Sequence, residues 1–132
     1  MRPNPSPYTY PAQVVRVVDG DTAICRIDLG FHISAEHSIR LADINAPELF
    51  SGTSFERGQG LASKVALTNL VDFAVARIRR EWPFILVTDK NKQTFGRYIG
   101  TLWEVDKLEV IETPASINDQ MVTGGHAAYQ SY

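Results

Sequence analysis

Short runs of apolar and β-branched residues alternate along the first third of the chain with polar turns. Residues 12–18 and 22–29 are rich in β-branched residues, and Asp19-Gly20 between them is typical of a tight turn. Apolar and polar residues are mixed over residues 31–44, which favours a third strand. The pattern therefore predicts three meandering strands at the start of the domain.

A second hairpin is expected in the C-terminal half. Pro83 marks a new start, because proline is tolerated at the beginning of a strand. Residues 84–88 and 95–103 are the two strand segments, and the polar residues 89–93 between them are expected to form the turn.

Helical spacing separates these two groups of strands. Apolar residues recur at three- and four-residue steps and predict a helix from Glu56 to about Val75. Its recurring apolar positions are Leu61, Val65, Leu70, Phe73 and Ala74. A second, short helix is expected to open with Ser116 or Asn118 as its N-cap and to end near Gly124.

Five strands with a helix after the third give the expected fold class, α+β but mainly β. We predict a five-stranded barrel of the oligonucleotide/oligosaccharide-binding kind (OB-fold) with two or three helices. Residues 1–11 form a proline-rich N-terminal arm, and residues 12–132 form the folded domain. We expect a monomer that is not a membrane protein, since no apolar run is long enough to cross a bilayer. The absence of a signal-like segment favours an intracellular or virus-encoded protein.

Composition narrows the function classes. The net charge of −2 argues against a protein that coats nucleic acid by neutralising phosphates. A local cluster at Arg77, Arg79 and Arg80 could still guide a polyanion, or it could simply stabilise a helix C-terminus. Cys25 is the only cysteine, so an internal disulfide is excluded and a buried thiol is expected. The three histidines lack metal-ligand spacing and are expected on the surface.

Two clusters of acidic residues and one arginine are the candidate functional residues. Asp19 and Asp21 lie in the tight turn, and Arg40 precedes the segment Ala46-Pro47-Glu48. Carboxylates at strand ends suit a hard, oxygen-binding cation, and a guanidinium group matches phosphate oxygens in a two-pronged fork. This combination points to phosphodiester chemistry.

Three blocks of sequence resemble the staphylococcal nuclease (thermonuclease) family in the family's own order. They are Val18-Asp19-Gly20-Asp21-Thr22, then Arg40 with Ala46-Pro47-Glu48, then Phe95-Gly96-Arg97. The resemblance covers roughly residues 12–132. Each block alone is short, but three ordered blocks within the expected strand and helix pattern are specific.

The resemblance implies a calcium-dependent nuclease that hydrolyses the phosphodiester bonds of DNA and/or RNA with low sequence specificity. It implies that Asp21 and the main-chain carbonyl of Ala46 ligate Ca²⁺. The guanidinium groups of Arg40 and Arg97 would hold the scissile phosphate, and Glu48 would orient or deprotonate the attacking water.

Departures from the family pattern affect the metal and the substrate pocket. Asn45 stands where the family usually has a second calcium-binding aspartate, so weaker metal binding is expected. Asp43 would supply the missing carboxylate if the strand continued through it, because it would then lie on the same face as Asn45. The favoured interpretation is that Asp43 is an outward, solvated acid. Phe95 could stack on a base. Tyr129 either packs against the nucleotide or closes the barrel.

Two functions therefore stay open. The first is the calcium-dependent nuclease. The second is a catalytically weakened barrel of the same fold that binds nucleic acid or a protein partner without cutting. Asn45 favours the second, whereas the joint presence of Asp21, Arg40, Glu48 and Arg97 favours the first.

Overall fold

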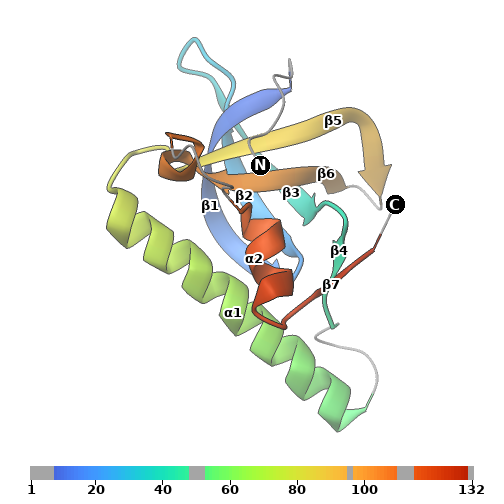
Figure 1. Ribbon diagram of the computed structural model, residues 1–132. Helices are drawn as coiled ribbons and strands as arrows, with labels where there is room; N and C mark the ends of the chain where they lie inside the picture. The colour runs from blue at the N-terminus through green and yellow to red at the C-terminus, as the bar shows by residue number, and fades with distance from the viewer. Residues whose placement is uncertain (1–7, 48–52, 95–96, 110–114, 131–132) are drawn as a thin grey trace.

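The computed structural model describes residues 8–47, 53–94, 97–109 and 115–130, and a closed β-barrel forms its centre (Figure 1). The elements in chain order are β1 Thr9–Asp19, β2 Thr22–Asp28, β3 Ser34–Leu41, β4 Ile44–Asn45, α1 Ser54–Ile78, β5 Phe84–Thr94, β6 Arg97–Glu104, the 3-10 helix η1 Val105–Glu109, α2 Ile117–Thr123 and β7 Ala128–Tyr129. The expected α+β, mainly β, OB-like barrel is confirmed.

The barrel strands follow the order β1-β2-β3-β6-β5, and β5 pairs with β1 to close the ring. All neighbouring strands are antiparallel except β3 and β6, which are parallel. A separate two-stranded sheet joins β4 to β7, so the end of the described chain lies beside the segment that follows β3. Closure leaves fewer free strand edges that would otherwise invite pairing with another chain.

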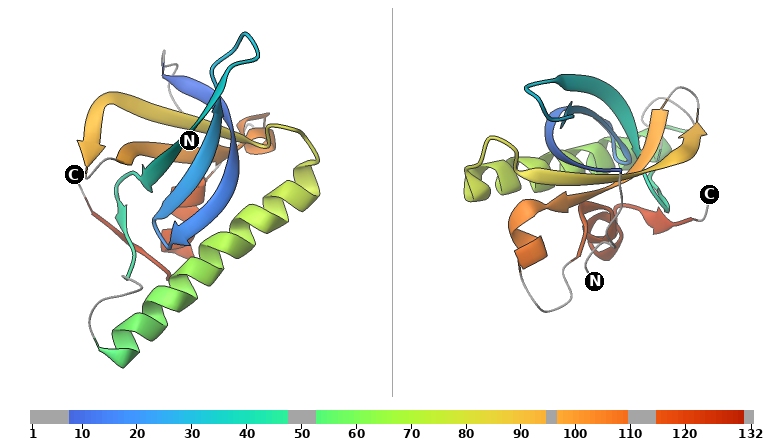
Figure 2. Two further views of the ribbon diagram at one scale, coloured as in Figure 1. Left: turned by 180° about the vertical axis from the view of Figure 1, so that it is seen from behind. Right: turned by 90° about the horizontal axis from the view of Figure 1, so that it is seen from above.

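Helix α1 runs along one side of the barrel and packs against β1, as the two side views show (Figures 1 and 2). Its N-cap is Thr53, whose hydroxyl accepts a hydrogen bond from the Glu56 amide. Its C-cap is Arg79, which has a left-handed backbone conformation. The helix is longer at both ends than the apolar spacing predicted. Arg77, in its last turn, pairs with Glu104 and Asp106, so this arginine serves the fold.

The face that α1 buries against the barrel contains small and apolar residues. The residues that it buries are Gly60, Ser63, Leu67, Val71 and Ala74. Of the recurring apolar positions, Ala74 is buried, whereas Leu61, Val65 and Phe73 are exposed. Apolar side chains occur all around this helix, and spacing alone could not tell which stripe the barrel would cover.

Two turns lie elsewhere than predicted. The β2–β3 connection contains Phe31 and His32 in the left-handed backbone region, so β3 begins only at Ser34. The expected turn over residues 89–93 is instead part of β5, which continues to Thr94. Residues 95–96 lie outside the described part of the chain. Among the described helices, none combines the length and hydrophobicity needed to cross a bilayer.

Asn118 joins two parts of the barrel to α2. Ser116 is the N-cap of this helix, and its hydroxyl accepts a hydrogen bond from the Asp119 amide. The amide oxygen of Asn118 accepts from the Leu102 amide at 3.1 Å. Its amide nitrogen donates to the Ala42 and Gly100 carbonyls at 3.0 and 3.2 Å. One buried side chain thus ties α2, β6 and the β3–β4 turn together.

Replacing Asn118 with alanine should lower the free energy of unfolding by about 2–4 kcal/mol. The variant removes the partner of the Leu102 amide and of the Ala42 carbonyl, and each such group costs about 1–3 kcal/mol when left unsatisfied. The Gly100 carbonyl keeps the hydrogen bond from the Ala42 amide. Urea unfolding measures the loss. Asn69→Ala is the matched control, because Asn69 is exposed on α1 and should change stability little. Equal stability of both variants would contradict this role.

Candidate active site

The β1–β2 turn is pressed against both α1 and the segment after β4. A Cβ atom added to Gly20 would lie 1.8 Å from the Ser63 hydroxyl oxygen and 2.8 Å from the Ala46 Cβ. Only glycine allows this close approach, although its backbone angles are ordinary. The Asp19 carboxylate accepts a hydrogen bond from the Asp21 amide at 3.2 Å and stabilises the turn. Asp21 is thereby held at a fixed distance from the β4 segment.

The Asp21 carboxylate receives contacts from several parts of the fold. Its Oδ2 accepts a hydrogen bond from the Ala46 amide at 2.9 Å and lies 3.3 Å from Arg40 Nη2. Its Oδ1 accepts from the Thr22 hydroxyl at 3.1 Å. The residue is only 7% exposed. A carboxylate so placed is largely removed from water and is neutralised mainly by protein groups.

Arg40 lies at the end of β3 and is equally buried, at 6% exposure. Its Nη1 donates to the carbonyls of Leu41 and Ile44, at 3.0 and 2.9 Å. Its Nη2 donates to Oδ1 of Asn45 at 3.2 Å. The guanidinium plane is therefore oriented by the backbone around the β3–β4 turn as well as by Asp21.

Arg97 approaches the same acid from the first residue of β6. Its Nη1 donates to the Thr22 hydroxyl oxygen at 3.2 Å, and that hydroxyl donates in turn to Asp21. Thr22 is opposite Arg40 in the β2–β3 register, and Arg40 is opposite Ile99 in the β3–β6 register. One guanidinium group thus contacts the buried carboxylate directly, and a second, from another strand, is linked to it through the Thr22 hydroxyl.

The structure brings together most of the residues that the sequence pointed to. Those that meet are Asp21, Arg40, Asn45, Ala46 and Arg97. Glu48 and Phe95 lie outside the described residues. Tyr129 pairs with Ile44 in the register of β7 and β4, and its hydroxyl donates to Asp119 of α2 at 3.1 Å. The Tyr129 side chain is thus engaged with α2.

Asp43 does not continue the pleat of β3. It lies in the β3–β4 turn with φ of +61° and is exposed. The condition under which it would share a face with Asn45 is not met, because the strand is interrupted between them. An exposed acid, the favoured interpretation of the sequence, is confirmed.

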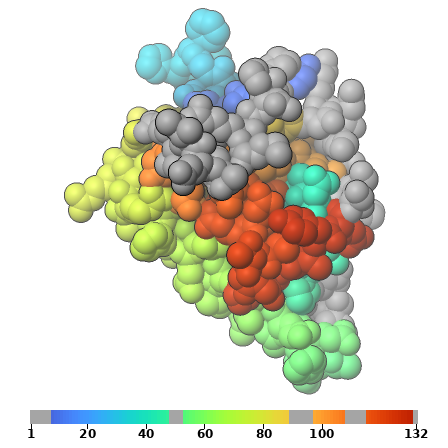
Figure 3. Space-filling view, viewed as in Figure 1, coloured from blue at the N-terminus to red at the C-terminus, as the bar shows by residue number. Residues whose placement is uncertain are grey.

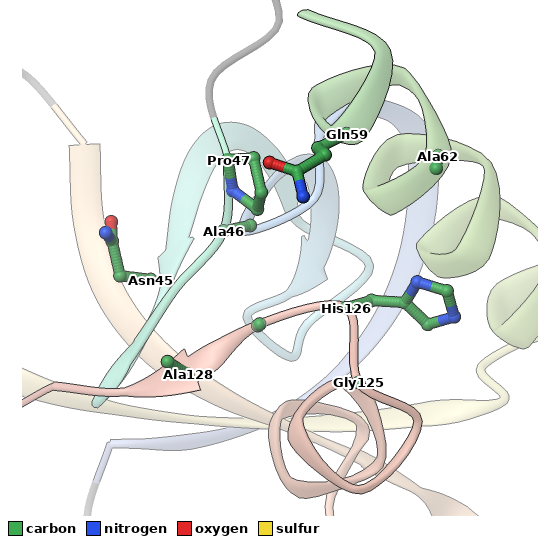
Figure 4. A pocket seen from close by; sticks show the side chains of 9 residues that line it. Asn45, Ala46, Pro47, Gln59, Ala62, Gly125, His126 and Ala128 are labelled. Carbon is green, nitrogen blue, oxygen red and sulfur yellow. The ribbon is translucent and has the colours of Figure 1, made fainter. Parts of the chain in front are cut away.

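A cavity of about 470 Å³ lies beside the site, between β4, α1 and the segment after α2 (Figure 4). Asn45, Ala46 and Pro47 line one side of it, and Gln59 and His126 line the others. Sequence patterns gave no signal for Gln59 or His126, because each is an exposed polar residue on a different element. The bridging role of Thr22 could have been suspected from its place beside Asp21.

The oxygen atoms around Asp21 fit a hard cation. Burial, followed by a hydrogen bond with the Asp19 carboxyl, raises the pKa of Asp21 to about 6, against the lowering influence of the Ala46 amide and Arg40. A buried carboxyl group whose charge is costly is one that a bound cation would relieve. Asn45 adds a neutral oxygen. The described residues contain no group of three or more histidine, cysteine or acidic ligands, so the charge on the donor set is low.

No family model matches the chain. The sequence is 30% identical over 116 residues to a protein of Escherichia coli named Protein ParB. The match covers 87% of this chain and 54% of that protein, so the chain spans about half the length of this relative.

The pKa of Asp21 predicts how stability depends on pH without added metal. The folded protein holds the Asp21 proton more tightly than the unfolded chain, whose value is 3.8. This contribution to stability is complete below pH 4 and is lost as the pH rises through 6. Between pH 3.5 and 7, Asp21→Asn should therefore gain up to about 3 kcal/mol over the unmodified protein.

Urea unfolding of both proteins at several pH values, in chelator, measures this difference. Asp43→Asn removes an exposed acid and is the matched control, whose profile should follow that of the unmodified protein. A stability difference between Asp21→Asn and the unmodified protein that stays constant across this pH range would contradict the account.

Proposed function

We propose that this chain is a calcium-dependent nuclease of the staphylococcal nuclease type, which hydrolyses DNA and/or RNA with low sequence specificity. The observation that supports it best is the approach of Arg40 and Arg97, from β3 and β6, to the buried carboxylate of Asp21. A structural ion pair needs one arginine. A second guanidinium group, linked to this acid only through the Thr22 hydroxyl, suits a site that also receives an anion.

Charge balance is the main contribution of this arrangement. A phosphodiester resists attack because it is anionic, and guanidinium groups lower the barrier by balancing the charge that builds on the phosphoryl oxygens. Arg40 is oriented by the Leu41 and Ile44 carbonyls, and its Nη2 contacts Asp21 and Asn45, so a phosphate would have to replace some of these contacts. The planar fork of arginine would bind two oxygens at once, which lysine cannot do.

Asp21, the Asn45 side chain and the Ala46 carbonyl would hold Ca²⁺ next to these arginines. When bound, the ion would add positive charge at the phosphate and make a coordinated water more acidic. Glu48 follows Pro47 directly in the sequence and would orient or deprotonate the attacking water. This last role depends on the family resemblance alone.

Low sequence specificity follows from the kind of contacts. Arginines that bind phosphate oxygens position a strand but carry no base information. Both DNA and RNA offer such phosphates, so the arginine pair does not by itself select between them.

Asn45 favours an alternative, a nuclease-like module that binds nucleic acid or a protein partner without cutting. Its side chain carries no negative charge, and its Oδ1 accepts a hydrogen bond from Arg40. Calcium would have to compete for that oxygen. A site with such weak metal affinity could retain phosphate binding and lose hydrolysis.

A cleavage assay on single-stranded DNA and RNA, with calcium and then with chelator, separates the two. The nuclease should cut only with calcium, and Arg97→Lys should lower the rate by roughly 10²-fold, as loss of one transition-state contact does. Glu48→Gln should abolish cleavage. Arg26→Lys is the matched control, because Arg26 forms an exposed pair with Glu36 on neighbouring strands.

Tight binding of either nucleic acid with no products over hours would overturn the nuclease and support the binding module. Cleavage that persists in chelator would contradict the calcium requirement.

A further inference from the structure

Helix α1 carries large apolar residues on the side that the barrel leaves uncovered. Leu61 is 54% exposed, Val65 48% and Phe73 68%. The residues that α1 buries against the barrel lie on the other side of the helix, at different positions of the helical repeat. The helix runs along the outside of the barrel, and its N-terminal end extends past the strands (Figures 1 and 2). Within the described part of the chain, no element covers this side.

The uncovered side is also poor in charge. Its exposed residues are Gly58, Leu61, Val65, Asn69, Asp72 and Phe73, and we call this strip the outward face. Asp72 is the one charged residue of the strip. The solvent side of a surface helix normally carries polar and charged residues, whereas a helix that is apolar on all sides is usually covered on all sides. The pattern therefore indicates that the outward face has a partner.

A second copy of the same helix fits this face in an antiparallel arrangement. A two-fold axis beside Val65 would bring the two Val65 side chains into contact, and an interface of this kind uses the same surface on both copies. Asp72 of one copy would then face Gly58 of the other. The space around Gly58 is open, so the two helices can approach closely at that point.

Charge complementarity favours this arrangement. Arg57 directly precedes Gly58, so Asp72 of one copy would lie beside Arg57 of the other. With 3.6 residues per turn, Arg57 and Asp72 project from the same flank of the outward face, and their side chains can meet. Two-fold symmetry forms the pair twice. Parallel helices would instead place like charges side by side, which is unfavourable.

The contact area determines how strong such an association can be. Contact from Arg57 to Phe73 would be about 25 Å long, because a helix rises about 1.5 Å per residue. Two helices in contact over this length bury on the order of 1,000 Å² in total, near the lower limit for a specific interface. We therefore expect a dimer that dissociates at about micromolar concentration.

We propose that α1 is a dimerisation helix, through which two copies of this chain associate by their outward faces, antiparallel and with Val65 on the two-fold axis. The association is independent of the proposed nuclease activity. It differs from the monomer expected from the sequence, because the outward face can be recognised only once the buried side of α1 is known.

Sedimentation velocity over a wide range of protein concentration tests the association. The unmodified protein should change from monomer to dimer in the micromolar range. Val65→Glu should stay monomeric, because two like charges would meet in an apolar contact. Ile33→Glu is the matched control and should dimerise normally. Ile33 is a similarly exposed β-branched residue in the β2–β3 connection, at the other end of the molecule from α1 (Figure 1).

Charge reversal tests the pairing of residues. Arg57→Asp and Asp72→Arg should each weaken the dimer about tenfold, since the symmetric interface contains the contact twice. The double variant again has opposite charges at the two positions, and it should regain the affinity of the unmodified protein. A double variant that associates as weakly as the single variants would contradict this pairing.

Disulfide cross-linking separates antiparallel from parallel helices. Val65→Cys should form a disulfide between copies under mild oxidation, because both residues lie at the axis. Asn69→Cys should not, since its two copies would be about 12 Å apart along the helices and a disulfide spans at most about 7 Å. Cys25 is buried and does not compete.

A monomer at every concentration would overturn the proposal. A dimer that Val65→Glu leaves intact would overturn it as well, because association would then use another surface. Disulfides through both Val65→Cys and Asn69→Cys would show parallel helices and overturn the arrangement. Thermal unfolding of each variant distinguishes lost association from lost folding.

Discussion

One buried carboxylate determines how the parts of this site lie relative to one another. Asp21 accepts the Ala46 amide, pairs with Arg40 and reaches Arg97 through the Thr22 hydroxyl. The contacts come from β2, β3, β6 and the segment after β4. A buried ion pair adds little net stability, because desolvation of both charges offsets their attraction. Its contribution here is positional, and burial raises the pKa of the Asp21 carboxyl to about 6.

The surrounding elements explain why this arrangement can persist. The side chain of Asn118 binds the backbone of β6 and of the β3–β4 turn, so α2 connects the strands that carry the two arginines. In the space-filling view, α2 and the segment after it cover the front of the barrel, above α1 (Figure 3). The close approach at Gly20 connects the acidic turn to α1. Rigid elements thus support a site that is itself electrostatically unfavourable, as pre-organised sites require.

Sequence reasoning succeeded where a signal is local and failed where it depends on tertiary contacts. Asp21 and Arg40 could be identified because a tight turn and a strand end are short-range features with few conformations. The buried face of α1 could not be predicted. Ser63 is buried and Phe73 is exposed there, since the choice of face depends on the approach of the β1–β2 turn. Asn118 was expected as a possible N-cap, and its long-range bonds have no sequence signature.

A crystal structure with Ca²⁺ and a short single strand carrying a cleavage-resistant phosphorothioate link tests the central claim most directly. The account predicts calcium at about 2.3–2.6 Å from an Asp21 oxygen. It also predicts one phosphate bonded to both Arg40 and Arg97. A strand bound elsewhere on the surface, with Arg97 still on the Thr22 hydroxyl and no ion at Asp21, would contradict it.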